Sequence, residues 1–186
     1  IWVKVPQIDQ NTNDDFIYLY YGNQSAIDAQ SPTNVWDTNF LGVWHENDNT
    51  GTNVNDSTLN NKDGTKQSIN QPTYNANGAI SGAQSYTQGS SRVGTTINTT
   101  LNNFTVEIWF KDDGVVTAYE RIADKNYTNC FWFGRNNNIS NSWGGGVMKT
   151  SDPYGIFVTL TDGQWHQIAS IRDGETHHIY GDGASV

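Results

Sequence analysis

An oxygen-rich stretch of the chain, residues 48–63, has the side chains that bind calcium. Ca²⁺ takes six to eight oxygen ligands from carboxylates, amides and main-chain carbonyls. We expect Asp48, Asp56, Asn61 and Asp63 to supply a structural calcium site that fixes this loop. The spacing is not that of an EF-hand, so the alternative interpretation is an ordinary solvated loop.

A second candidate site is an Asn-rich stretch around Trp143, which has the groups that bind sugars. A sugar needs a flat aromatic ring against its C–H face and amides for its hydroxyls. Trp143 offers the ring and Asn141 an amide, while Tyr127 and Tyr154 lie in nearby predicted loops. The alternative is that Trp143 caps the core. Four other tryptophans fall in predicted strands and are expected in the core or between sheets: Trp44, Trp109, Trp132 and Trp165.

Residues that could catalyse a reaction are not paired as the chemistry requires. Glycoside hydrolysis needs two carboxylates about 5–9 Å apart. Glu107 has no second acid two or four positions further along its predicted strand. His177 and His178 are adjacent, so in a strand they face opposite sides, and only one of them could neighbour His166 across a hairpin. Cys130 precedes three aromatic residues, which indicates a buried small side chain and not a nucleophile.

Asparagine and threonine dominate the composition, with 23 and 20 residues in a chain of 186. These residues produce sequons for N-glycosylation, which are compatible with a surface protein. The six sequons begin at Asn23, Asn55, Asn98, Asn103, Asn126 and Asn138.

The charge balance limits the partners. The net charge is −9 and only 10 residues are basic, so binding to nucleic acid through phosphate contacts is not expected. One cysteine excludes an internal disulfide, and no apolar stretch approaches the roughly 18 residues of a membrane span. These features predict an extracellular or cell-surface protein.

Strand-like runs separated by turn residues predict an all-β fold. Apolar side chains alternate over residues 104–110, and Asp-Gly turns precede two further strands at 164–172 and 177–180. The continuous apolar run at 16–22 predicts a well-buried strand. Asparagine and glycine over residues 136–146 predict a loop. No helix longer than one or two turns is expected.

Four segments in order resemble the laminin-G-like, concanavalin A-like jelly rolls. Residues 162–169 and 179–183 are similar to the family's "DGxWHxVA…LYVDG" hairpin, and 104–111 to its "FTVSAWVK" strand. Residues 78–86 and 56–64 match its "GKxGxALSF" and "DSSGNGNDG" segments. The resemblance implies a β-sandwich over residues 41–186, incomplete at its C-terminus because the family pattern continues further, with calcium near the Asp/Asn loop.

The beginning of the chain carries a second resemblance. Residues 2–6 and 17–23 are similar to the end of a small β domain of unknown function that often precedes laminin-G-like domains in bacterial and archaeal surface proteins. We therefore expect residues 1–40 to be the C-terminal part of such a module.

Three functions remain open. The first is non-catalytic recognition of a glycan or another cell-surface ligand. The second is a structural subunit or stalk segment of a surface layer or filament, in which an open strand edge pairs with a neighbouring copy. The third is a glycoside hydrolase, against which the missing second carboxylate argues.

Overall fold

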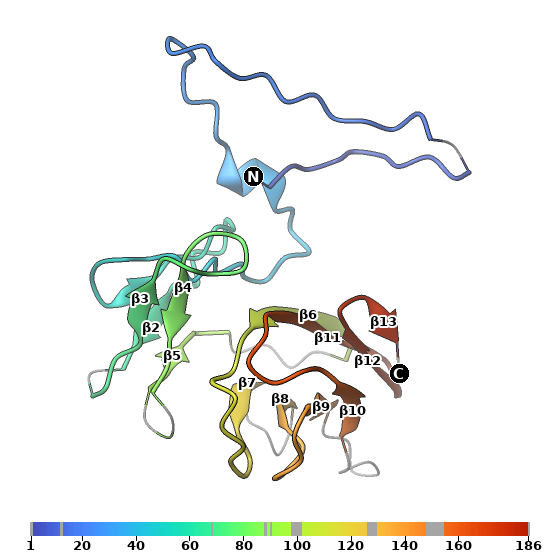
Figure 1. The fold of residues 1–186 in the computed structure, drawn as a ribbon. Helices are drawn as coiled ribbons and strands as arrows, with labels where there is room; N and C mark the ends of the chain where they lie inside the picture. The colour runs from blue at the N-terminus through green and yellow to red at the C-terminus, as the bar shows by residue number, and fades with distance from the viewer. Residues whose placement is uncertain are drawn as a thin grey trace. The chain divides into compact units, whose positions relative to one another are not determined.

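The chain is almost entirely β in the computed structural model. The structure describes residues 2–11, 13–67, 69–87, 89, 91–97, 102–125, 130–147 and 155–185. These residues contain thirteen strands and one single-turn helix, which confirms the predicted all-β class (Figure 1). The chain divides into two compact units: unit 1 comprises residues 1–76 and 82–97, and unit 2 comprises residues 77–81 and 98–186.

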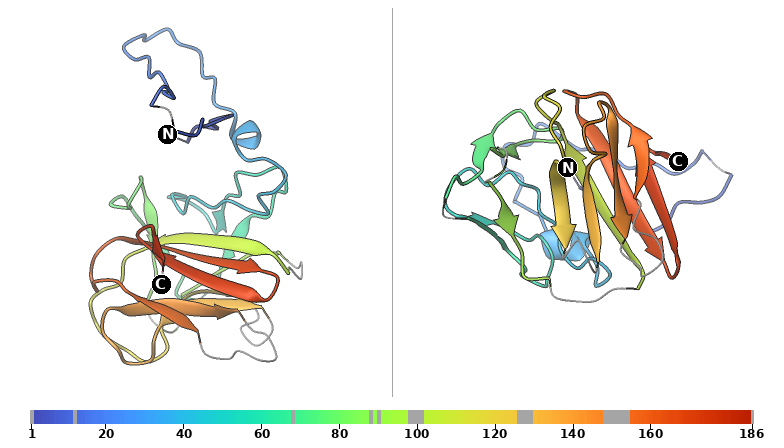
Figure 2. Two further views of the ribbon diagram at one scale, coloured as in Figure 1. Left: turned by 90° about the vertical axis from the view of Figure 1, so that its right-hand side faces the viewer. Right: turned by 90° about the horizontal axis from the view of Figure 1, so that it is seen from below.

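Unit 2 is a sandwich of two four-stranded antiparallel sheets, seen edge-on in Figure 2. The first sheet has the strand order β13-β12-β11-β6 and the second has the order β10-β9-β8-β7. The strands of the first sheet are β6 (Phe104–Phe110), β11 (His166–Asp173), β12 (Thr176–Gly181) and β13 (Ala184–Ser185). Those of the second are β7 (Arg121–Lys125), β8 (Phe131–Arg135), β9 (Ser142–Val147) and β10 (Ile156–Thr159).

The core of unit 2 forms between the inner faces of these sheets. Ile168 and Ile179 of the first sheet and Phe133 of the second are fully buried. Ile168 pairs with Ile108 of β6, so the alternating side chains of residues 104–110 point toward the core as predicted. Trp109, on the other face of β6, is 44% exposed.

Strand β9 corrects the prediction of a loop at residues 136–146. Only the first part of that stretch is a turn, whereas Ser142–Val147 is the strand between β8 and β10. Three consecutive glycines are typical of a loop. In β9 they let the neighbouring strands β8 and β10 approach the backbone closely. A Cβ on Gly144 would lie 2.0 Å from the Ile156 carbonyl oxygen, and one on Gly146 would lie 2.7 Å from Trp132 Nε1.

Unit 1 has short strands joined by long loops. β1 (Asn53–Val54), β2 (Gly64–Lys66) and β5 (Val93–Gly94) form a three-stranded antiparallel sheet, and β3 (Thr73–Asn75) pairs with β4 (Ala83–Ser85). The helix α1 (Pro32–Val35) begins with proline, whose fixed φ suits the first helical turn. Val54 is fully buried, and polar side chains line the rest of the small interior.

The predicted strands at the start of the chain do not form. Residues 2–6 and 16–22 have no strand partner among the described residues, and the side chains of 16–21 lie mostly in solvent. The sequence has the β-prone pattern, but a strand requires a hydrogen-bonded neighbour, which the described part of the chain does not provide. Across the described residues, no helix is long and apolar enough to cross a membrane.

Candidate functional site

Unit 1 has a polar depression of about 580 Å³ in the loop before and around β1. Amides, hydroxyls, one carboxylate and one glycine line it, and no aromatic side chain is among them. The lining residues are Asn47, Asp48, Asn49, Thr50, Gly51, Thr52, Asn53 and Asn55. Gly51 has a φ of +74°, a conformation that favours glycine at the loop tip.

Buried polar side chains donate hydrogen bonds to the backbone of this loop. Lys66 and Gln84 are 5% and 9% exposed. The Lys66 ammonium donates to the Asp48 carbonyl at 3.2 Å, and the Gln84 amide donates to the carbonyls of Glu46 and Asp48 at 3.2 and 2.9 Å. These bonds fix the backbone from which the depression is built. Burial raises the pKa of Glu46, whose carboxyl accepts a hydrogen bond from Tyr86.

Asp48 and Asn55 close the base of the loop. The Asn55 side-chain amide donates to one Asp48 oxygen, and the Asn55 backbone N–H donates to the other at 3.3 Å. Within the described residues, the side chains of Asn47, Asn49 and Asn53 make no protein hydrogen bond, so their amides are available to a ligand.

Asp56 organises the neighbouring part of the loop. Its carboxylate accepts hydrogen bonds from the backbone N–H groups of Val43, Thr58 and Lys62, at 2.9, 3.0 and 2.9 Å, and from the Thr58 hydroxyl at 2.8 Å. Burial acts to raise the pKa of Asp56, but these donors outweigh it and hold the pKa below its usual range. The Asp56 carboxylate thereby fixes this part of the loop through protein donors.

The four predicted calcium ligands have separate partners. Both oxygens of Asp56 are engaged by protein donors, Asp63 accepts the Asp56 backbone N–H, and Asn61 donates weakly to Leu59. Asp48 lines the depression, and both of its carboxylate oxygens accept hydrogen bonds from Asn55. No group of three or more His, Cys, Asp or Glu side chains suited to a metal converges in the described part of the chain. Of the four predicted ligands, Asp48 is the one that lines the depression, beside side-chain amides whose oxygens are of the kind that Ca²⁺ takes.

Trp143 belongs to the core of unit 2, as the second of its two interpretations expects, and it does not form an exposed platform for a sugar. It is 2% exposed. The Arg135 guanidinium lies 4.2 Å from its ring centroid and Phe110 lies 4.8 Å away, so the ring has no free face for a sugar. Asn141 turns inward as well: it accepts the Asp162 N–H, and its own N–H donates to the Asp162 carboxylate. Tyr127 and Tyr154 lie outside the described residues.

The other four tryptophans differ in exposure. Trp109 is 44% exposed, and the remaining three are only partly buried: Trp44, Trp132 and Trp165. Trp132 packs on the outer face of its sheet under Arg121, whose guanidinium lies 4.2 Å from the ring centroid.

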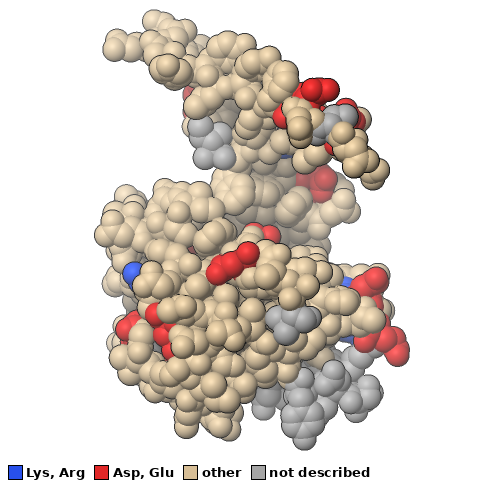
Figure 3. Space-filling view, turned by 45° about the vertical axis from the view of Figure 1, so that its right-hand side comes forward, with Lys and Arg blue, Asp and Glu red and all other residues tan. Residues whose placement is uncertain are grey.

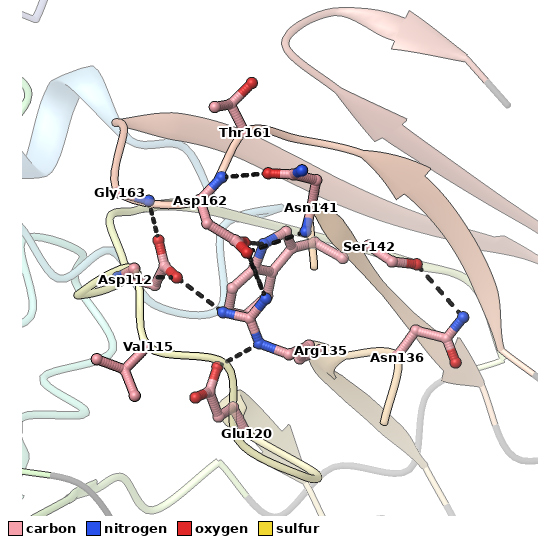
Figure 4. A network of polar contacts seen from close by, with 12 residues as sticks. Asp112, Val115, Glu120, Arg135, Asn136, Asn141, Ser142, Thr161, Asp162 and Gly163 are labelled. Atoms are coloured by element: carbon pink, nitrogen blue, oxygen red, sulfur yellow. Dashed lines mark hydrogen bonds and ion pairs between the residues drawn. The ribbon is translucent and has the colours of Figure 1, made fainter. Parts of the chain in front are cut away.

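Arg135 is the centre of a buried ion-pair network in unit 2 (Figure 4). Its side chain is fully buried at the end of β8. The guanidinium contacts Asp112 Oδ2 at 2.7 Å, Glu120 Oε2 at 2.7 Å and Asp162 Oδ1 at 2.8 Å. The Trp143 indole N–H also donates to Asp162, at 2.9 Å. Two loops, the one between β6 and β7 and the one between β10 and β11, are thereby tied to one cation.

No sequence signal pointed to this network. Arg135 ends an aromatic run, and its three acids lie 15 to 27 residues away in turns. The acids do not form a free catalytic pair, since each is bonded to Arg135 and Asp112 also accepts the Gly163 N–H. Burial alone would lower the pKa of Arg135, but the bonds to Glu120 and Asp162 raise it, so the guanidinium stays charged.

Acid should destabilise unit 2 through Asp162. Burial acts to raise the pKa of Asp162, but donors from Asn141, Trp143 and Arg135 hold it below the ordinary value of about 3.9. A depressed pKa stabilises the fold above the unfolded value, and that stability is lost as the pH falls through the folded pKa. We therefore expect the melting temperature of unit 2 to decrease steeply below about pH 4.

Asp162→Asn tests this assignment. The variant should be less stable than the wild type at pH 7, and its melting temperature should change less between pH 5 and pH 3. Circular dichroism melts over a pH series measure both. An unchanged acid slope in the variant would show that other carboxylates carry the effect.

The remaining polar residues named from the sequence have structural partners. His177 and His178 face opposite sides as predicted: His177 bonds to the buried Ser170 hydroxyl at 2.8 Å, whereas His178 is exposed. His166 lies beside Asp182 at 2.7 Å and not beside either of them. Glu107 accepts a hydrogen bond from Gln167. Cys130 is 8% exposed, as expected for a small core side chain.

Four of the six sequon asparagines are described, and all four are exposed: Asn23, Asn55, Asn103 and Asn138. Asn98 and Asn126 lie outside the described residues. A glycan on Asn55 would compete with its bond to Asp48.

Acidic residues outnumber basic ones on the face of the molecule that Figure 3 shows.

Part of the chain is similar to a known protein family. Residues 1–62 match a family described as a domain of unknown function (DUF2341). The match covers the residues expected to form the small β module and continues past residue 40 through the depression and Asp56. No curated protein and no solved structure matched the chain.

Proposed function

We propose that this chain is an extracellular recognition module that binds a glycan or another hydroxyl-rich surface ligand without catalysis. The observation that carries the proposal is the depression at residues 47–55. Sugars are recognised by amides and carboxylates that meet their hydroxyls, and this lining is composed of such groups. The hydrogen bonds from Lys66 and Gln84 to the Asp48 carbonyl keep the backbone in place, which lowers the entropic cost of binding.

The sandwich of unit 2 supports assignment to the laminin-G-like, concanavalin A-like class. The "DGxWHxVA…LYVDG"-like segment lies in β11 and β12, which are neighbouring antiparallel strands, and the "FTVSAWVK"-like segment is β6 beside them. Such domains act as recognition modules as well as enzymes, so the fold by itself does not decide the function. The absence of an unpaired carboxylate pair around Arg135 favours the binding role.

Substitution of Asn49 and Asn53 should abolish most glycan binding. Each lost hydrogen bond costs about 1 kcal/mol, so Asn49→Ala with Asn53→Ala should weaken binding roughly 30-fold. The measurement is a glycan array with the purified chain, followed by calorimetric titration of the best ligand. Asn138→Ala, an exposed asparagine of unit 2, is the matched control and should bind like the wild type.

Two results would contradict the proposal. One is a wild-type chain that binds no glycan on the array. The other is a double variant with unchanged affinity, which would place the ligand elsewhere.

Repeating the titration in chelator tests calcium at Asp48. We expect weaker binding and a lower melting temperature of unit 1, because a bound ion stabilises the state that holds it.

A further inference from the structure

The polar interior of unit 1 holds an amine beside a carboxamide. Lys66 belongs to β2 and Gln84 to β4, which are strands of different sheets. Both side chains are buried, at 5% and 9% exposed. A lysine amine is a nucleophile toward carbonyl carbon, and a carboxamide offers such a carbon with ammonia as its leaving group.

The two side chains meet at one acceptor, the backbone carbonyl of Asp48. Lys66 Nζ donates to this oxygen at 3.2 Å and Gln84 Nε2 donates to it at 2.9 Å. Gln84 Cδ is one covalent bond from Nε2, and the four-carbon stem of lysine is flexible, so rotation of the stem turns Nζ toward Cδ. Fixing two reactants side by side replaces a bimolecular encounter with an intramolecular step.

The carbonyl oxygen of the Gln84 side chain has no partner. Gln84 Oε1 is buried without a hydrogen bond, the one such side-chain atom among the described residues. Gln84 Nε2, in contrast, donates to two carbonyls, those of Glu46 and Asp48. Buried polar atoms in folded proteins nearly always have a partner, so this oxygen lacks a donor. Attack at Cδ places negative charge on the same oxygen, where a donor stabilises it.

Glu46 supplies a group that can carry protons between the two side chains. Its backbone carbonyl accepts a hydrogen bond from Gln84 Nε2 at 3.2 Å, and the Lys66 ammonium acts electrostatically on its carboxyl. A carboxylate takes a proton from an amine and returns it to a leaving nitrogen, which is general acid–base catalysis. Burial of the pair also excludes water that would compete for the carbonyl carbon.

We propose that unit 1 cross-links itself through an amide bond between Lys66 Nζ and Gln84 Cδ. Glu46 takes a proton from the ammonium, and the neutral amine attacks Cδ. A bond forms between Nζ and Cδ, the bond between Cδ and Nε2 breaks, and a second proton passes from Nζ to Nε2, which leaves as ammonia. Ammonia then takes the first proton from Glu46 and departs as ammonium. Atoms and charge balance without any further reactant.

The cross-link joins β2 to β4 covalently and fixes the two side chains that hold the Asp48 carbonyl. It does not depend on whether the depression binds a glycan. Its product is measured by mass, so the two proposals fail or succeed separately.

Intact-mass spectrometry of the 186-residue chain tests the proposal. After overnight incubation at neutral pH, we expect a mass lower than that of the sequence by one ammonia. Tandem mass spectrometry of a protease digest should find a branched peptide that joins Lys66 to Gln84. Lys66→Arg should keep the full sequence mass. Lys62→Arg is the matched control and should lose ammonia like the wild type, because Lys62 is only partly buried and its backbone N–H makes the bond to Asp56.

Glu46→Gln separates the chemistry from the proximity of the pair. The variant retains an oxygen for the Tyr86 hydroxyl but carries no proton, so the cross-link should form about a hundredfold more slowly. Circular dichroism verifies that all variants are folded. The proposal is overturned by a wild type with the full sequence mass, by an equal ammonia loss in Lys66→Arg, or by a branched peptide without Gln84. Cross-linking of Glu46→Gln at the wild-type rate would overturn the role of Glu46.

Discussion

Replacing Arg135 with methionine should remove a large part of the free energy of unfolding of unit 2. The substitution leaves the carboxylates of Asp112, Glu120 and Asp162 partly buried without their cation. Removing one partner of a buried ion pair costs about 3–5 kcal/mol, and a domain has only about 5–15 kcal/mol in total. The stacking of the guanidinium on Trp143 is lost as well.

Urea unfolding followed by near-ultraviolet circular dichroism measures this effect. Arg121→Met is the matched control, because Arg121 also lies 4.2 Å above a tryptophan ring but is exposed. It should cost less than about 1 kcal/mol.

A compensated variant separates charge from packing. Arg135→Met combined with Asp112→Asn, Glu120→Gln and Asp162→Asn removes the uncompensated charges, and it should recover part of the lost stability. If Arg135→Met is as stable as Arg121→Met, the network does not hold unit 2 together. If the compensated variant is no better than the single variant, uncompensated charge is not the cause.

The second large effect is expected from Asp56→Ala in unit 1. One carboxylate accepts four hydrogen bonds, from Val43, from Lys62 and twice from Thr58, which is itself 2% exposed. An unsatisfied buried donor costs about 1–3 kcal/mol, so the loss should reach about 3 kcal/mol or more. Hydrogen exchange of these three amides should accelerate together, because they share one acceptor.

Asp63→Ala is the control for Asp56→Ala. Asp63 accepts a single backbone N–H, that of Asp56, so its loss should cost about 1 kcal/mol. Equal destabilisation by the two variants would contradict a special role for Asp56. Protection of the same amides by added calcium in Asp56→Ala would revive the metal as the organiser of this loop.

The sequence predicted those strands of unit 2 that show apolar alternation or are joined by a typical turn. Residues 104–110 alternate apolar and polar side chains, and β6 has these bounds. The turn at Asp173-Gly174 joins β11 to β12 as expected. Both signals are local, since alternation and turn chemistry act within a few residues.

Predictions failed where the environment decides the role of a residue. Trp143 follows an Asn-rich turn and precedes three glycines, which is a loop pattern, yet β8 and β10 pair with both sides of its strand. The pattern at residues 16–21 is that of a buried strand, yet no described segment pairs with it. Hydrogen-bonded neighbours decide both cases: β9 has one on each side, whereas residues 16–21 have none among the described residues.

By itself the sequence determined the all-β class, the acidity, the exclusion of an internal disulfide and the opposite orientation of His177 and His178, because each depends on composition or local periodicity. Only the tertiary structure revealed that Arg135 collects three acids from distant turns and that Asp56 holds its loop through four donors. The physical reason is that a buried charge requires partners that are close in space. The residues of the turns that supply those partners do not by themselves predict the pairing.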